Sequence, residues 1–184
     1  KPVYDILING LKKLEYRGYD SSGIMIYNQK VLVKKAKGKV SDLESLFVNS
    51  ADKHGHLGIG HTRWATHGPP NQINSHPHTS NSGEITLVHN GIIENYDSIK
   101  KILTLKGYVF HSDTDSEVLV NLIEDIKKTK NVKLGKAVYF ALKQVVGAYA
   151  IVVFDSKNPK EIVGARLGSC LLYTSPSPRD GHQS

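Results

Sequence analysis

The sequence contains very little cysteine, methionine or tryptophan, with one residue of each in 184. The single cysteine, Cys170, has no partner for an internal disulfide, which excludes a disulfide-stapled miniprotein and is typical of a reducing compartment. The longest uninterrupted apolar stretch, Ala148 to Phe154, is far shorter than the roughly 20 residues that span a bilayer. No apolar leader opens the sequence. We therefore expect a cytoplasmic protein with no membrane partner.

Acidic residues are also in the minority, 17 against 24 basic ones, and the net charge is +7. Most of the basic residues are scattered lysines, whereas nucleic-acid readers use arginine for bidentate base contacts. We therefore expect a solvated basic surface and no nucleic-acid partner. With 39% apolar residues, the length suits one domain with a proper core.

Apolar spacing in the first half predicts a helix followed by hairpins. We expect a helix over 2–14, strands over 23–28 and 31–36, a short helix over 40–47 and a strand over 57–62. A polar loop over 19–22 precedes the first strand, and a long loop rich in His, Pro, Asn and Ser covers 63–83. Hairpins without regular βαβ alternation indicate a mixed α and β domain.

The second half continues with strands at both ends and helices between them. We expect a strand over 84–89 ending in a turn at Asn90-Gly91, then a helix that begins after Asn95. Helices over 118–127 and 134–145 and strands over 148–154 and 161–166 follow. Asn95 is a candidate cap for the first of these helices, whose buried face would be Ile99, Ile102 and Leu103. Thr114 and Glu117 have the spacing of a capping box.

Seven of the nine histidines lie between His54 and His89. The pairs His54-x-His56 and His76-x-His78 suggest a metal site, because histidine is a common zinc ligand. No carboxylate lies among residues 53–83, and no zinc motif accompanies the pairs. Histidines that hydrogen-bond the backbone of a loop are the favoured alternative.

Two charged residues follow predicted element boundaries. Arg63 directly follows a predicted strand, and with Thr66 and His67 it could bind a carboxylate. The alternative is a surface arginine stacked on Trp64. Asp115 at a helix start is either a partner of the helix dipole or a receptor for a substrate ammonium group.

Asn90-Gly91 after a strand is usually a type I′ hairpin turn. Its functional alternative is an oxyanion site made of the Asn90 amide and the Gly91 backbone N–H. Together with Arg63 and Asp115, such a site would recognise an α-amino acid with a side-chain carbonyl. No nucleophile accompanies it, since Cys170 has no base near it in the sequence.

Several longer strings carry a family resemblance. They are Glu15–Gly23 (EYRGYDSSG), His61–Gly68 (HTRWATHG), Asn74–His78, Val88–Asn95 (VHNGIIEN), Ser112–Glu117 (SDTDSE) and Gly147–Tyr149. In this order, the chain closely resembles the class II glutamine amidotransferase domains of the enzymes that make glucosamine 6-phosphate from fructose 6-phosphate. The resemblance covers 1–169. We expect 170–184 to be a disordered or artefactual tail.

The resemblance implies an α+β Ntn-hydrolase fold, a four-layer αββα sandwich of two mostly antiparallel sheets, here without its first strand. It also implies roles for single residues, and it implies no cofactor and no metal. Asn90 and Gly91 would form the oxyanion hole, Arg63, Thr66 and His67 would hold the glutamine carboxylate, and Asp115 would hold its amine. Arg17 would stand beside the nucleophile, Trp64 would gate ammonia, and the His76 segment would close over the site.

In that family an N-terminal cysteine attacks the glutamine amide and its own α-amine acts as base. The chain begins with Lys1, so we expect the piece itself to be inactive and less stable for want of a strand. The intact enzyme would be a homodimer with downstream sugar-isomerase domains that bind fructose 6-phosphate. The alternatives are a non-catalytic glutamine-binding or regulatory module and a His-loop metalloprotein.

Overall fold

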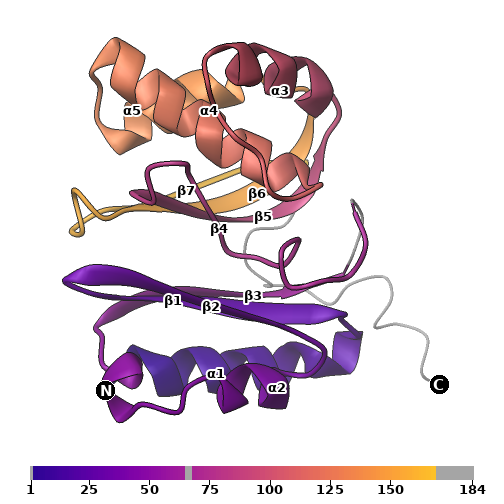
Figure 1. Cartoon of the computed structure of the whole chain (residues 1–184), viewed down its shortest axis with the longest axis vertical. Coiled ribbons are helices and arrows are strands. Elements are labelled where there is room, and N and C mark those ends of the chain that lie inside the picture. Colours follow the sequence, from indigo (N-terminus) through magenta and orange to yellow (C-terminus); the bar gives the residue numbers. More distant parts are fainter. Residues whose placement is uncertain (1, 65–67, 169–184) are drawn as a thin grey trace.

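The protein forms four layers, with helices on the outside and two facing sheets inside (Figure 1). The computed structural model describes residues 2–64 and 68–168. Helices α1 (Val3–Leu14) and α2 (Val40–Ser45) cover the first sheet. Helices α3 (Tyr96–Leu105), α4 (Asp115–Lys130) and α5 (Leu134–Leu142) cover the second. The predicted αββα sandwich is therefore confirmed.

The first sheet has the order β2-β1-β3 and is antiparallel throughout. Its strands are β1 (Ser21–Asn28), β2 (Lys30–Lys37) and β3 (Leu57–Arg63). Alternate residues of a strand face opposite sides. Gly58 and Gly60 of β3 lie against side chains of α1, so Ile59, His61 and Arg63, which alternate with them, face the second sheet.

The second sheet has the order β4-β5-β6-β7 and is also antiparallel. Its strands are β4 (His78–Thr79), β5 (Ile85–Ile93), β6 (Gly147–Asp155) and β7 (Ile162–Leu167). Helix α4 is buried along 115–126. It packs against α3, α5 and β5.

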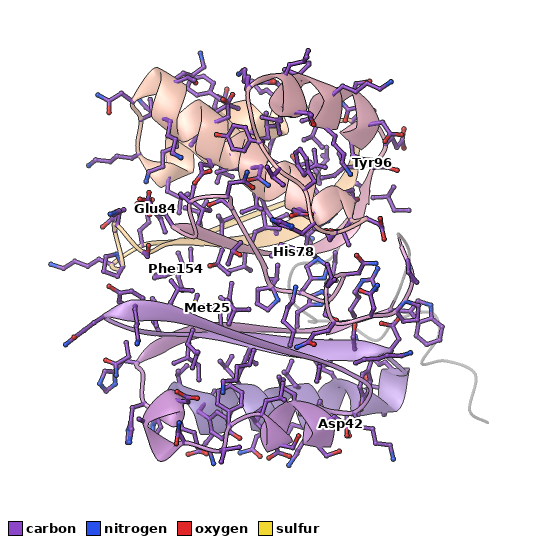
Figure 2. All side chains as sticks on the ribbon, in the orientation of Figure 1. Met25, Asp42, His78, Glu84, Tyr96 and Phe154 are labelled. Carbon is purple, nitrogen blue, oxygen red and sulfur yellow. The ribbon has the colours of Figure 1, made fainter. Side chains whose placement is uncertain are left out.

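Apolar side chains from both sheets form a separate core between them. Met25, Ile59, Val88 and Phe154 make up this intersheet core. Figure 2 shows Met25 and Phe154 in the space between the two sheets. The Phe154 ring is fully buried, with its centre 5.1 Å from that of Tyr27. This packing sets the spacing of the sheets and therefore of the side chains that face each other across them.

Truncating Phe154 tests this core. We expect Phe154→Ala to lower the free energy of unfolding by about 3–5 kcal/mol, because a buried aromatic ring is lost and a cavity remains. Urea unfolding followed by circular dichroism measures the change. Leu167→Ala is the control, because that side chain is 57% exposed and its loss should cost far less. Equal losses in the two variants would contradict the described packing.

Most predicted elements are found, but the predicted turn at Asn90-Gly91 is wrong. Both residues lie inside β5, paired with Ala150 and Tyr149 of β6. The prediction failed because Asn-Gly follows a strand-like run, a pattern that local sequence cannot separate from a hairpin. The strand continues because β6 satisfies its backbone hydrogen bonds.

Three further predictions of local structure need correction. Ser21 and Ser22, expected in a polar loop, are buried residues of β1. The predicted loop over 63–83 contains the short strand β4. The Asn95 side chain does not cap α3, because it donates to Gln144 O and accepts from Val146 N instead.

The predicted buried face of α3 is only partly right. Ile99 and Leu103 are buried, whereas Ile102 is 56% exposed. Thr114 does accept a hydrogen bond from the Glu117 N–H, so half of the predicted capping box forms. The Glu117 carboxylate turns instead to the backbone of His111 and Ser112. Within the described ranges, no helix is long and apolar enough to cross a membrane.

Candidate active site

Four of the sequence-predicted site residues converge at one end of the space between the sheets. Arg63 is the last residue of β3, Asn90 and Gly91 lie in β5, and Asp115 begins α4. A hydrogen bond joins the two sheets here, with His61 Nε2 2.7 Å from Asn90 Oδ1. The fold therefore brings together residues far apart in the sequence.

Arg63 is a buried cation rather than a surface one. Its side chain is 4% exposed, and Nη1 lies 3.8 Å from Asp20 Oδ1. The Asp20 N–H donates to Arg63 O at 2.8 Å, which joins the two residues through the backbone as well. Burial lowers the pKa of the guanidinium, while the Asp20 and Asp115 carboxylates raise it. The alternative of an arginine on the protein surface is therefore wrong.

Asp115 connects the start of α4 to the end of β5. Its Oδ2 accepts a hydrogen bond from the Ile93 N–H at 2.9 Å, and the side chain is almost fully buried. Its Oδ1 lies 3.4 Å from Ser116 Oγ and 3.9 Å from His89 Nδ1. The carboxylate also lies in the first turn of the helix, where negative charge is favourable. The helix-dipole role and a binding role are thus compatible.

The contact with His61 fixes the orientation of the Asn90 amide. With Asn90 Oδ1 as the acceptor, the matching tautomer of His61 carries its proton on Nε2 and donates it. His61 Nδ1 has no hydrogen-bond partner in the described part of the chain. Asn90 is exposed, so its NH₂ group is left to donate to a molecule in the site. This is the orientation that an oxyanion site requires.

Gly91 adopts a backbone conformation that favours glycine, with φ of 127°. A Cβ at this position would stand 2.1 Å from Ala148 O on the neighbouring strand. The residue must therefore lack a side chain for β5 and β6 to pair next to Asn90.

Three histidines with lowered pKa values form a cluster, here called the histidine group, in which ring centres of neighbours lie 4.4 and 4.8 Å apart. They are His61, His76 and His78. His76 Nε2 lies 2.9 Å from Ser116 Oγ, and His78 Nε2 lies 3.1 Å from Thr114 Oγ1. Burial lowers the pKa of His61 to about 4 and holds those of His76 and His78 well below 6.5. The group is therefore neutral at physiological pH.

Stability should consequently fall as the pH drops below 6.5. The unfolded chain takes up protons on these histidines from pH 6.5 downward, whereas the folded chain stays neutral until about pH 4 at His61. Each histidine of the group should lower the free energy of unfolding by up to about 1.4 kcal/mol per pH unit. Urea unfolding at pH values between 7.5 and 5.5 measures this dependence of the unfolding free energy on pH. Most carboxylates titrate below this pH range and do not contribute to it.

Two variants separate the histidine group from other titrating residues. His78→Gln should reduce the slope of the unfolding free energy against pH by up to about 1.4 kcal/mol per pH unit. Replacement of the exposed His54 by glutamine should leave this slope unchanged. A flat dependence between pH 7.5 and 5.5 would contradict the neutral, buried state of the group.

The remaining predicted site residues divide into three sets. Arg17 is exposed, and its Nε donates to Tyr16 Oη at 2.9 Å. Trp64 is 69% exposed, and its ring lies against Gly18. Thr66 and His67 lie outside the described residues.

Among residues 2–64 and 68–168, no three His, Cys, Asp or Glu side chains form a group that could hold a metal ion.

Sequence reasoning missed three residues that support this site, namely His61, Ser116 and Asp20. A signal for His61 was present, because it lies two residues before Arg63 on one strand and so faces the same side. Ser116 Oγ lies 2.9 Å from both His76 Nε2 and His89 Nδ1. Its role depends on long-range packing, and the local sequence contains no signal for it.

Comparison with known proteins assigns the chain to a family. Residues 38–181 match the model of the glutamine amidotransferase domain. The chain therefore belongs to the glutamine amidotransferase domain family.

The relatives point to one enzyme within that class. The chain is 55% identical over 174 residues to the glutamine–fructose-6-phosphate aminotransferase (isomerizing) of Bacteroides thetaiotaomicron, covering 94% of this chain and 28% of the relative. It is 46% identical over 170 residues to the enzyme of that name from Pyrococcus horikoshii, covering 91% of this chain and 28% of the relative. The chain thus spans about 28% of the length of these curated relatives.

Solved structures support the fold. A glutamine phosphoribosylpyrophosphate amidotransferase from B. subtilis superimposes with a TM-score of 0.72 at 28% identity. That match covers 89% of this chain and 34% of the other. A class-II glutamine aminotransferase domain protein from Silicibacter pomeroyi, at 15% identity and a TM-score of 0.52, shares the fold alone.

Proposed function

We propose that the site at Arg63, Asn90, Gly91 and Asp115 binds L-glutamine and supports hydrolysis of its side-chain amide. The buried guanidinium of Arg63 holds the α-carboxylate, and the Asp115 carboxylate holds the α-ammonium group. Asn90 Nδ2 and the Gly91 N–H donate to the amide oxygen as negative charge develops on it. Thr66 and His67, which follow Arg63 in the sequence, complete the carboxylate site.

The observation that carries the proposal is the arrangement of opposite charges across the two sheets. A buried arginine and a buried aspartate lie near an amide whose acceptor oxygen is already occupied by His61. An α-amino acid presents one negative group, one positive group and, in glutamine, one carbonyl. Such a ligand matches the charges of the site group by group.

Hydrolysis also needs a nucleophile. No cysteine lies in the described part of the chain, and Cys170 falls outside it. We propose that a cysteine at a chain N-terminus attacks the amide carbon and that its own α-amine accepts the thiol proton. The C–N bond then breaks as the α-ammonium returns this proton to the leaving ammonia, and water hydrolyses the thioester to glutamate and free cysteine. An α-amine titrates near neutral pH and lies within reach of its own side chain, so it can act as the base. The chain as given should then release no ammonia.

The test compares two proteins. One is the chain as given, and the other has Met-Cys-Gly-Ile and a strand of the family placed before Lys1, with the methionine removed by processing. Ammonia release from L-glutamine is measured for both. The extended chain should be active and the chain as given should not.

Other results would change the proposal in distinct ways. A folded extended chain that binds glutamine without cleaving it would support the non-catalytic binding module instead. A folded extended chain that neither binds nor cleaves glutamine would show that the four residues are not the site. An extended cysteine-to-alanine variant is the control for activity from contaminants.

For the intact protein, we propose a larger role. The ammonia would pass to downstream sugar-isomerase domains that bind fructose 6-phosphate, producing glucosamine 6-phosphate in the cytoplasm. Trp64 would gate this transfer, the His76 segment would close over the site, and Arg17 would stand beside the nucleophile. The names of the curated relatives support the reaction, and a homodimeric state is part of the same proposal.

A further inference from the structure

Lys35 is a partly buried cation without a carboxylate partner. It lies on β2 and faces the second sheet together with Val31 and Val33, because alternate strand residues share a face. Its Nζ donates to Ile73 O at 3.0 Å. Among the described residues, no carboxylate oxygen lies within 4.0 Å of this nitrogen. Lysines that do form ion pairs include Lys12, Lys34, Lys106, Lys127, Lys128 and Lys157.

A cavity of about 870 Å³ opens beside Lys35. Besides Lys35, it is lined by residues 72–73, the stretch 78–83, Val109, His111, Ser112 and Glu117. Its volume lies in the range typical of small-molecule sites. Arg63, Asn90, Gly91 and Asp115 are not among the residues that line it. The cavity is therefore distinct from the proposed glutamine site.

The acidic groups near the cavity are already occupied. The Glu117 carboxylate accepts from the backbone N–H groups of His111 and Ser112 and from Ser112 Oγ, at 3.0, 2.7 and 2.6 Å. Glu124 accepts from the hydroxyls of Ser80 and Ser82. Neutral donors thus satisfy the Glu117 carboxylate, and Glu124 also forms an ion pair with Lys128.

The positive charge of Lys35, by contrast, has no carboxylate within ion-pair distance among the described residues. Removing an ammonium group from water is costly unless an anion compensates it. Burial lowers the pKa of Lys35 to about 8, an effect that the Glu117 carboxylate opposes and the Arg63 guanidinium reinforces. An anion bound in the cavity would stabilise the charged amine and restore its pKa toward the usual range.

We propose that this cavity binds a small organic anion, a carboxylate or a phosphate ester, whose charged group contacts Lys35 Nζ. The ammonium group has donors to spare, since Ile73 O occupies one of them. The apolar part of the ligand would lie against Ile73 and Val109, which line the cavity and are 55% and 56% exposed. This second site goes beyond the proposed glutaminase function and does not depend on it.

Reactivity of the lysine amines tests the proposal directly. The folded chain is labelled with a succinimidyl acetate at pH 7.5 in inorganic phosphate, in citrate, or in sodium chloride of equal ionic strength. Peptide mass spectrometry then gives the rate at each lysine. Phosphate or citrate at about ten times its dissociation constant should slow labelling of Lys35 about tenfold, and that of Lys37 hardly at all.

A thermal unfolding series provides the second measurement. Phosphate or citrate should raise the unfolding midpoint above the sodium chloride value in the parent chain and in Lys37→Met. That rise should be smaller in Lys35→Met, which keeps only the general effect of these salts on folded proteins. Protection by phosphate alone or by citrate alone would identify which anionic group the site prefers.

Two results would overturn the proposal. One is labelling of Lys35 at the same rate in all three salts. The other is equal protection of Lys35 and Lys37, which would show general screening rather than a site. If Lys35→Met does not fold, the labelling of the parent chain alone decides.

Discussion

Replacing Asn90 with alanine is expected to lower kcat of the cysteine-extended protein by about 10²–10³, the usual effect of removing one oxyanion donor. The side chain donates mainly to the oxygen of the transition state, so KM for L-glutamine should stay nearly constant. His61 holds the amide in the donating orientation through its 2.7 Å contact with Asn90 Oδ1. Steady-state ammonia release measures both constants.

The matched control for this prediction is Asn158→Ala. Asn158 lies in the turn between β6 and β7, where its side chain donates to Glu161 Oε2. Its replacement should leave kcat and KM unchanged. If Asn90→Ala raised KM and left kcat intact, Asn90 would bind ground-state glutamine and would not be the oxyanion donor.

Gly91→Ala is expected to destabilise the pairing of β5 and β6 beside the site. Its Cβ would meet Ala148 O at 2.1 Å, and φ of 127° is unfavourable for alanine. Strain and overpacking together should lower the free energy of unfolding by about 2–5 kcal/mol, because β5 must move away from β6. Urea unfolding of both proteins measures the loss.

Gly107→Ala isolates the steric part of this effect. Gly107 also has a positive φ, 92°, but a Cβ there would meet nothing within 4 Å. Its replacement should therefore show only the conformational cost, about 1 kcal/mol. Equal losses for the two variants would mean that the close approach of Ala148 O to Gly91 does not constrain the sheet.

Local patterns predicted most of the fold because apolar residues recur with a clear helical or strand period within most of its elements. The helix over 2–14 and the strand pairs 23–28 with 31–36 and 148–154 with 161–166 all appear, with ends shifted by a few residues. The two-residue strand β4 was missed because so short a strand has no period of its own. It forms only because β5 offers a free edge for His78 and Thr79.

The candidate site was harder to predict than the fold. The places of Arg63 and Asp115 at element ends left two roles open for each residue, one structural and one in ligand binding. The family resemblance favoured the binding role in both cases. Burial decided the case of Arg63, and burial depends on how two sheets stack. Ser116 was missed for the same reason, since its partner His76 comes from a distant part of the chain, whereas the alternation of β3 could have indicated His61.

The central claim is that Arg63 and Asp115 hold the two charged ends of glutamine, and ligand titration tests it most directly. An isotope-labelled sample of the chain is titrated with L-glutamine, with glutaramic acid, which lacks the amine, and with 4-aminobutanamide, which lacks the carboxylate. Nuclear magnetic resonance follows the Arg63 side chain, the Asn90 amide and the Ile93 N–H that donates to Asp115.

We expect saturable shifts of all three signals with L-glutamine. Loss of either charged group should weaken binding, with 4-aminobutanamide failing to shift Arg63 and glutaramic acid failing to shift Ile93. Equal binding of the three compounds, or shifts confined to residues remote from these signals, would contradict the account.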